Sequence, residues 1–235
     1  MSNTMQSNRY IFIYSSVMVT LVALILSSAA MFLRPMQDRN VKIERMQNIL
    51  SSVNIIATRA EAEELFARYI VDSKVVNIQG EEIDGNAFDI DLAVEVRKAP
   101  EQRSLPLFIA EVENQTFYII PVRGAGLWGP IWGFLSLQND LTTIFGANFD
   151  HASETPGLGS QIGERAFEEQ FVGERIFDEA GNFAPVRVVR GGARVDDPHG
   201  VDAVSGGTIT SQGVDEMLLE GLGNYVSYFK KLQSL

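Results

Sequence analysis

The sequence predicts an α+β protein in which an N-terminal transmembrane helix precedes a domain with a largely antiparallel sheet flanked by helices. Three observations lead to this fold class. An uncharged apolar run extends from Tyr10 to Leu33, paired segments with strand patterns fill the middle of the chain, and helical spacing returns near the C-terminus. The 235 residues suffice for such an anchor and for one domain with a sizeable core.

The composition excludes several classes of function. The net charge is −11, from 19 basic and 30 acidic residues, and no basic cluster is present that would bind nucleic acid. There is no cysteine, and the only histidines are His151 and His199. Disulfides, iron–sulfur ligation by this chain alone and the usual zinc sites are therefore not expected. Redox chemistry would require an organic cofactor or a partner protein.

The apolar run predicts a transmembrane helix at residues 10–33, after a short tail at residues 1–9. About 20 apolar residues cross a bilayer as a helix. The apolar part of a cleaved signal peptide is shorter, roughly 7–15 residues. A cleaved signal remains the alternative, because four small residues lie late in the run: Ser27, Ser28, Ala29 and Ala30.

The charges that flank the run bear on its orientation. Arg9 precedes it, whereas four basic residues follow it: Arg34, Arg39, Lys42 and Arg45. Taken alone, the positive-inside rule places the following domain in the cytoplasm. The rule has less weight here, because large domains are exported despite their flanking charges.

Residues 34–57 are expected to form an amphipathic stalk helix, and residues 58–235 the folded domain. Pro35 should end the span, and apolar residues then recur at helical spacing: Ile43, Met46, Leu50 and Val53. Thr58 and Glu61 have the spacing of a capping box, which predicts a helix that continues to about Ile70.

Alternating patterns predict the strands. From Phe88 to Val96 apolar residues occupy every second position, as in a half-buried strand. Residues 107–112 and 116–122 flank Glu113-Asn114-Gln115 and predict a hairpin. Residues 128–137 and 141–149 predict a second hairpin around Asn139.

The last third of the chain predicts two helices and one strand. Residues 164–172 have a helical pattern, and Val186 and Val188 indicate a strand that ends before Gly191-Gly192. The final helix has apolar residues at helical spacing: Val214, Leu218, Leu222, Tyr225 and Phe229. No repeat, low-complexity tract or second domain is evident.

The segment from Asp202 to Ser211 is the most informative for function. Gly206 and Gly207 allow positive φ and a close approach of the backbone to a ligand. Hydroxyl residues then lead directly into the C-terminal helix, whose N-terminus offers free N–H groups and partial positive charge to a phosphate. The alternative is an ordinary glycine turn followed by a Ser/Thr helix cap.

The string Asp202-Ala203-Val204-Ser205-Gly206-Gly207-Thr208 resembles the flavinylation motif of FMN-binding domains in sodium-translocating NADH:quinone reductase and its relatives. In that family a flavin transferase esterifies the phosphate of FMN to the threonine that closes the motif. The resemblance implies that Thr208 carries covalent FMN, with Thr210 as the second choice. Gly207 stands where the commonest form of the motif has alanine, a departure that preserves small size.

A second string, Glu154-Thr155-Pro156-Gly157-Leu158-Gly159, resembles the family's loop that lies against the flavin. Pro156 and two glycines favour a tight turn. Glu154 and Thr155 would offer hydrogen bonds, and Leu158 an apolar cover. The resemblance thus implies a cofactor site made of Thr208, Ser205, Gly206, Gly207, Glu154, Thr155, Gly157, Leu158 and Arg190, with no catalytic residue and no metal ligand.

The resemblance extends from the span to the C-terminus and best fits the C subunit of the sodium-translocating reductase. It implies an electron carrier of the bacterial inner membrane with its FMN domain in the periplasm. The complex would pass electrons from NADH through FAD and iron–sulfur centres to covalent FMN and on to ubiquinone, with sodium transport. The implied partners are the A, B, D, E and F subunits, membrane lipid, and a flavin transferase during maturation.

Two other interpretations remain open. The G subunit of the related ferredoxin:NAD oxidoreductase has the same cofactor and tether, and an anchored extracytoplasmic scaffold would use the glycines only as a turn. Several residues also have plainer interpretations. Trp128 and Trp132 are expected in the sheet or core, and His151 and His199 in solvent. Arg190 could offset negative charge on the reduced flavin, or it could be an ordinary charged residue at the end of a strand.

Overall fold

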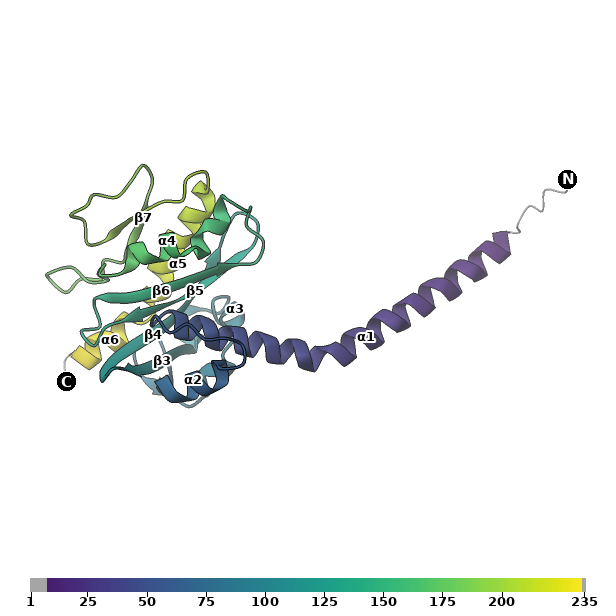
Figure 1. The fold of residues 1–235 in the computed structure, drawn as a ribbon, viewed down its shortest axis with the longest axis horizontal. Coiled ribbons are helices and arrows are strands. Elements are labelled where there is room, and N and C mark those ends of the chain that lie inside the picture. Colours follow the sequence, from purple (N-terminus) through teal and green to yellow (C-terminus); the bar gives the residue numbers. More distant parts are fainter. Residues whose placement is uncertain (1–7, 234–235) are drawn as a thin grey trace. The chain divides into compact units, whose positions relative to one another are not determined.

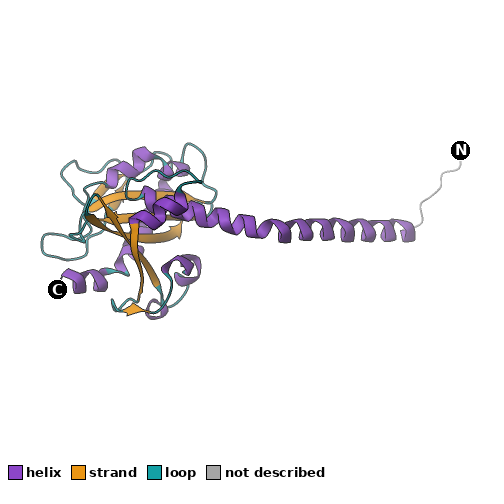
Figure 2. Cartoon of the chain, turned by 60° about the horizontal axis from the view of Figure 1, so that its bottom comes forward, coloured by secondary structure: helices purple, strands orange, loops and turns teal. Residues whose placement is uncertain are grey.

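The computed structural model describes residues 8–233, so most of the expected tail at residues 1–9 lies outside the described part. Figures 1 and 2 show helices on both sides of a sheet in the domain. The helices are α1 Asn8–Ser51, α2 Ala62–Tyr69, α3 Leu92–Glu95, α4 Arg165–Glu168, α5 Thr208–Gly223 and α6 Val226–Gln233, with short 3-10 turns η1 Ala87–Asp89, η2 Pro100–Gln102, η3 Gly159–Gly163 and η4 Glu169–Phe171. The strands are β1 Ile70–Val76, β2 Glu82–Ile83, β3 Leu105–Val112, β4 Gln115–Ala125, β5 Pro130–Leu137, β6 Ile144–His151, β7 Arg187–Val189 and β8 Gly200–Asp202.

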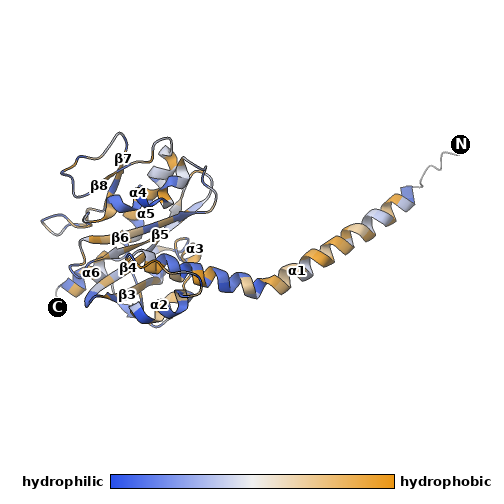
Figure 3. Ribbon diagram, viewed as in Figure 1, coloured by the Kyte–Doolittle hydropathy of each residue, from blue (hydrophilic) through white to orange (hydrophobic). Residues whose placement is uncertain are grey.

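The first helix has 44 residues and continues through Pro35, where the sequence led us to expect a break. Its part up to Arg45 forms a unit of its own, and the domain begins at Met46. Figure 3 shows the apolar residues concentrated in the earlier part of α1. By length and composition, α1 is the one helix in the described part that could cross a membrane. The boundaries at residues 10–33 and 34–57 stay predictions.

Six strands form one antiparallel sheet in the order β2-β1-β3-β4-β5-β6. Both predicted hairpins are confirmed. Val112 pairs with Gln115, so the first hairpin turn contains only Glu113 and Asn114, both with positive φ. Such a two-residue turn with two left-handed residues matches the twist of the flanking strands. The second hairpin joins β5 to β6.

The strand expected at residues 88–96 is wrong, because this segment forms η1 and α3. The side chain of Asn86 accepts a hydrogen bond from the Phe88 N–H, and that of Asp91 accepts one from the Ala93 N–H. Each bond starts a helical turn, and such local caps override a period-2 pattern. Strand β1 was not expected from the sequence, and within it only Val75 and Val76 are buried.

Each face of the sheet has its own apolar cluster. On one face, Ile120 and Leu135 pack against α5 residues such as Val214 and Leu218. On the other face, a smaller cluster includes Phe108. Figure 1 shows α5 and α4 on the opposite side of the sheet from α2. The final helix is confirmed but ends at Gly223, and α6 follows it.

A second, two-stranded sheet leads into α5. Strand β7 pairs in parallel with β8, and Val189 lies opposite Asp202. The strand expected around Val186 and Val188 is therefore confirmed in β7. The predicted helix at residues 164–172 is present as α4 followed by η4. The loop after β8 leads directly to Thr208, the first residue of α5.

Candidate functional site at the start of α5

Thr208 is the first residue of α5, and no side chain caps the helix. Gly206 has φ +74°, a left-handed conformation that glycine adopts without strain. The Ser211 N–H donates to the Gly207 carbonyl oxygen at 2.8 Å, which closes the first turn. The preceding backbone amides have no acceptor within the helix. Together with the helix dipole, they make this end of α5 suitable for an anion.

The hydroxyls in the first turn of α5 differ in accessibility. Thr208 is half-buried, whereas Thr210 and Ser211 are each 1% exposed. The Thr210 hydroxyl donates to Glu154 Oε2 at 2.6 Å. Ser211 Oγ accepts a hydrogen bond from the Val204 N–H at 3.1 Å. Thr208 is thus the accessible hydroxyl of this turn, and Ser205 in the preceding loop is exposed.

The loop at residues 154–159 lies directly against the loop that precedes α5. A Cβ placed on Gly206 would lie 2.6 Å from Leu158 Cδ2, and one on Gly207 would lie 3.3 Å from Gly159 Cα. The structure thus brings the two sequence motifs together. Leu158 remains 42% exposed, so its side chain can also cover a bound group. Gly157 has φ +73°, and the Thr155 carbonyl oxygen accepts a hydrogen bond from the Leu158 N–H at 3.1 Å.

Glu154 points inward and is only 5% exposed. Its Oε1 accepts a hydrogen bond from the Trp128 N–H at 2.9 Å, and its Oε2 accepts the bond from Thr210. Both carboxylate oxygens are therefore occupied by the protein. The sequence suggested that Glu154 offers a hydrogen bond to the ligand, whereas the structure shows its bonds going to two neighbouring segments.

The turn between β4 and β5 contributes exposed apolar side chains that were not expected from the sequence. The Gly126 N–H donates to the Gly129 carbonyl oxygen at 2.8 Å, which leaves Leu127 51% and Trp128 65% exposed. The expectation that Trp128 lies in the sheet or core is wrong. The sequence signal for this exposed position is the pair of glycines, Gly126 and Gly129, that flank Trp128 in the hairpin turn. Trp132, by contrast, lies in β5 and is half-buried.

Arg190 is exposed at the end of β7. The Ala203 N–H donates to the Val189 carbonyl oxygen at 3.0 Å, so the chain at Arg190 runs beside the start of the Thr208 loop. The two histidines are not simply solvated, in contrast to the expectation from sequence. His151 Nδ1 accepts a hydrogen bond from the Glu154 N–H at 3.2 Å, and His199 Nδ1 lies 2.7 Å from the Arg175 carbonyl oxygen.

A cavity of about 210 Å³ lies beside Ser205. Its lining includes Gln161, Glu164, Ala166, Phe167, Gln170, Asp202, Ala203, Val204 and Ser205. Buried ligand pockets are usually larger, roughly 300–1,000 Å³. This cavity by itself is therefore too small to enclose a flavin-sized ring. Within residues 8–233 no group of acidic, histidine or cysteine side chains is arranged to hold a metal ion.

Glu168, the last residue of α4, contacts the edge strand β6 of the sheet. Its Oε1 accepts hydrogen bonds from the Phe149 N–H at 2.7 Å and from Asn148 Nδ2 at 3.2 Å. Burial raises the pKa of Glu168 to about 7, and the nearby Asp150 adds to this rise, whereas the two hydrogen bonds oppose it. This carboxyl group therefore titrates close to neutral pH.

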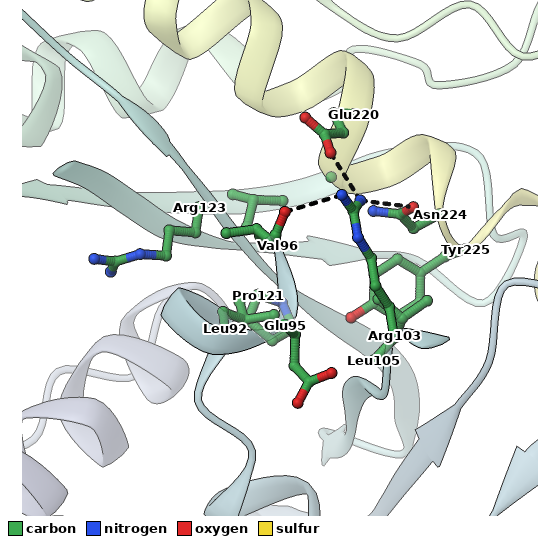
Figure 4. Close-up of a pocket in the computed structure, with 12 residues that line it drawn as sticks. Leu92, Glu95, Val96, Arg103, Leu105, Pro121, Arg123, Glu220, Asn224 and Tyr225 are labelled. Carbon is green, nitrogen blue, oxygen red and sulfur yellow. Dashed lines mark hydrogen bonds and ion pairs between the residues drawn. The ribbon is translucent and has the colours of Figure 1, made fainter. Parts of the chain in front are cut away.

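The opposite end of α5 is fixed by a buried cation (Figure 4). Arg103 is 8% exposed, and its guanidinium donates to Glu220 at 2.7 Å and to the Val96 carbonyl oxygen at 3.0 Å. Further donations go to the Lys98 carbonyl oxygen at 3.2 Å and to Asn224 Oδ1 at 3.5 Å. The adjoining cavity of about 20 Å³ is too small for a cofactor.

The comparisons with known proteins agree with the position of this site. Residues 126–223 match the FMN-binding domain family. This range begins at the turn that contains Trp128 and ends with α5. It therefore includes both motifs and the glycine turn.

Two curated relatives match most of the chain. The C subunit of the Na(+)-translocating NADH-quinone reductase of Vibrio vulnificus is 32% identical over 220 residues, which cover 86% of this chain and 86% of the relative. The same subunit of Haemophilus ducreyi is 31% identical over 231 residues, covering 88% and 89%.

Solved structures extend the similarity to the fold. The crystal structure of this subunit from Parabacteroides distasonis has a TM-score of 0.78 at 42% identity, covering 84% of this chain and 96% of that chain. The crystal structure of Shewanella oneidensis NqrC has a TM-score of 0.70 at 25% identity, covering 83% and 100%.

Proposed function

Because the chain belongs to the family of C subunits of Na⁺-translocating NADH-quinone reductases, we propose that it is the electron-carrier flavoprotein of such a reductase and holds FMN by a phosphoester on Thr208. When bound, the flavin supplies reversible uptake and release of electrons. The chain itself attaches and orients the flavin, and no separate substrate site is needed. Family membership favours this function over the G subunit of the ferredoxin complex and over a scaffold without flavin.

The observation that carries the proposal is the position of Thr208 at the uncapped start of α5. An ester phosphate on Thr208 Oγ1 would lie beside backbone amides that lack a helical acceptor, and the helix dipole would stabilise its negative charge. The buried Thr210 hydroxyl already donates to Glu154, which favours Thr208 as the acceptor. Ser205, Gly206 and Gly207 form the loop that leaves Thr208 accessible.

The side chains around Thr208 fit an aromatic ring held at the surface. Four exposed apolar residues lie on the adjoining segments: Leu127, Trp128, Leu158 and Ile209. Leu158 also touches the loop at Gly206, so it is placed to keep water from one side of a ring tethered nearby. Thr155 and Gly157 shape that loop, and Arg190 would offset negative charge on the cofactor. A surface position leaves part of the ring accessible to a redox partner.

Attachment requires an activated flavin phosphate, since an unactivated phosphate and a hydroxyl do not condense readily in water. The Thr208 oxygen would bond to the flavin phosphorus while the bond to a phosphate leaving group breaks. The leaving group would take the bonding electrons, and the hydroxyl proton would go to a base. Nearby Glu154 already accepts bonds from Trp128 and Thr210, which favours a base supplied by a separate flavin transferase.

The remaining parts of the proposal concern location and partners. We place α1 across the bacterial inner membrane, in contact with lipid, and the domain in the periplasm. The partners would be the A, B, D, E and F subunits, with quinone reduction and sodium transport as activities of the whole complex. The charges after the span argue for the opposite side, so orientation needs its own test.

Orientation can be tested with a single cysteine, because the chain has none. Ala180 is exposed in a surface turn, and Ala180→Cys introduces one thiol there. An impermeant thiol reagent should label it in intact cells whose outer membrane has been made leaky. Labelling that appears only after the inner membrane is broken would place the domain in the cytoplasm.

Covalent attachment can be tested by producing the full chain with and without a flavin transferase. After denaturing electrophoresis, a fluorescent flavin band should follow the chain only when the transferase is present. A transferase-positive sample without this band would contradict the proposal. Noncovalent FMN is removed by denaturation, so the band measures the tether and not affinity.

A further inference from the structure

We propose that Glu154 is a positioning residue that joins the three segments of the FMN site, acting through its hydrogen bonds to Thr210 and Trp128. This inference rests on the proposed function for the identity of the bound group. It assigns Glu154 a different role from a flavin ligand. The three segments are the hairpin turn at residues 126–129, the loop at residues 154–159 and the first turn of α5.

The geometry makes Glu154 the shared contact of these segments. One carboxylate oxygen accepts the Trp128 N–H at 2.9 Å, and the other accepts the Thr210 hydroxyl at 2.6 Å. Bonds from two different segments therefore converge on one side chain that is 5% exposed. Ser153 Oγ also donates to the Trp128 carbonyl oxygen at 3.2 Å, which reinforces the contact between loop and turn.

Two glycines provide the space for this carboxylate. A Cβ on Gly126 would collide with Glu154 Oε1, and a Cβ on Gly159 would lie 2.5 Å from both Glu154 Oε2 and Thr210 Oγ1. Both glycines have ordinary φ, so conformational freedom does not explain them. The close approach of the buried carboxylate accounts for glycine at both positions.

The carboxylate is buried without a cation. Within the described residues, no Lys or Arg forms a salt bridge with Glu154. Burial of an unpaired charge is costly, and here two hydrogen bonds and the positive end of the α5 dipole offset that cost. A further titratable group, His151, contacts the backbone of this residue and accepts a hydrogen bond from the Glu154 N–H.

The consequence concerns the two apolar side chains of the site. Trp128 is 65% exposed and Leu158 is 42% exposed, so packing alone does not hold these side chains in place, although Leu158 touches the loop at Gly206. Glu154 fixes the backbone at Trp128 and also anchors the loop that carries Leu158 to α5. Loss of the carboxylate should therefore loosen both side chains relative to Thr208 while the rest of the fold remains intact.

Glutamine and alanine separate geometry from charge at this position. In Glu154→Gln, the amide oxygen can accept from Trp128 and the amide nitrogen can donate to Thr210 Oγ1, so both links persist without the charge. Glu154→Ala removes both links. Thr210→Val removes one link and leaves a buried carboxylate oxygen without its donor, whereas Thr210→Ser retains the hydroxyl.

The first measurement is amide hydrogen exchange of the full chain in detergent before flavin is attached. The peptide that contains Trp128 should exchange severalfold faster in Glu154→Ala than in the wild type, and Glu154→Gln should restore protection. Peptides from β3 and β4 should be unchanged, which shows that the fold is intact. Unchanged exchange at Trp128 in Glu154→Ala would overturn the proposal.

The second measurement uses the flavin-loaded chain. Quenching of flavin fluorescence by iodide should increase severalfold in Glu154→Ala and Thr210→Val, and it should stay near the wild-type value in Glu154→Gln and Thr210→Ser. Equal quenching in all four variants would overturn the proposal. The wild-type chain could fail to acquire FMN while the variants still show the expected differences in hydrogen exchange. That result would contradict the proposed function and support the role of Glu154.

Discussion

The two ends of α5 have opposite characters, although they belong to one 16-residue helix. At the N-terminal end, Thr208 follows two glycines, lacks a side-chain cap and is partly accessible. At the C-terminal end, Arg103 is buried and donates to four acceptors, and the buried Tyr225 hydroxyl donates to the Pro106 carbonyl oxygen at 2.7 Å.

This difference explains how a rigid element can present an accessible group. The C-terminal end ties α5 to the sheet and to the segment after α3, while the apolar side of the helix packs on β4. The N-terminal end is then free to leave its amides and one hydroxyl available. The comparison predicts that substitutions at the two ends change different properties, attachment at one end and stability at the other.

The largest expected effect is at the N-terminal end. Thr208→Val is nearly isosteric but has no hydroxyl, so it should abolish the covalent flavin band completely. The midpoint of thermal unfolding should change little, because the half-buried hydroxyl has no buried partner among the described residues. Thr208→Ser is the matched control and should retain attachment. Persistent flavin in Thr208→Val would show that another residue is the acceptor.

At the C-terminal end, Arg103→Met should lower the free energy of unfolding by about 2–4 kcal/mol, because the buried guanidinium loses its charge-assisted hydrogen bonds to part-buried backbone and side-chain acceptors. Chemical denaturation of the full chain in detergent measures this change. Glu220→Ala should cost less than about 1 kcal/mol, because the Glu220 side chain is 64% exposed. Flavin attachment should persist in both variants. Loss of attachment with intact folding would contradict the separation of the two ends.

A smaller effect is expected at Leu158. An apolar neighbour disfavours added negative charge, so Leu158→Asn should raise the midpoint potential of the attached flavin and slow turnover of the assembled complex. Attachment should be unaffected. Leu219→Asn is a matched control, since Leu219 is 55% exposed but lies further along α5. Redox titration that gives equal midpoints for both variants and the wild type would remove Leu158 from the site.

The smallest effect concerns pH. Glu168 has a pKa of about 7 in the folded chain and an ordinary value of 4.5, so the folded state binds the proton more tightly. Its contribution to stability is complete below pH 4.5 and is lost as the pH rises through 7. The nearby Asp150 contributes to the raised pKa of Glu168. Burial also raises the pKa of Glu174, so Glu174 likewise contributes stability that is lost as the pH rises.

Glu168→Gln should therefore flatten part of the decline in thermal stability across this pH range and stabilise the chain above it. Thermal unfolding midpoints measured at several pH values test this expectation. Glu169→Gln is the control, because the Glu169 side chain is 58% exposed. Parallel pH profiles for Glu168→Gln and the wild type would show that Glu168 does not titrate as described.

The sequence was sufficient where local pattern and tertiary packing agree. Hairpins with strong alternation and a turn such as Glu113-Asn114 follow from local chemistry, and so does the periodic face of α5. The segment at residues 88–96 failed because two Asx caps started helical turns in an alternating sequence. Strand β1 was missed because its polar residues dilute the apolar pattern.

The site was predictable only where it depends on local sequence. The two motifs identify the residues near Thr208, because glycines and hydroxyl groups before a helix have a direct chemical meaning. The inward direction of Glu154 and the exposure of Trp128 depend on contacts between segments distant in sequence. Such contacts leave no periodic signal, so only the folded chain reveals them.

The central claim is that the start of α5 carries the flavin on Thr208, and peptide mass spectrometry tests it most directly. The full chain, produced with a flavin transferase, would be digested and the peptide that contains Thr208 and Thr210 fragmented. An added mass equal to FMN minus one water is expected on Thr208. The same mass on Thr210, or on neither residue of a chain that retains covalent flavin, would contradict it.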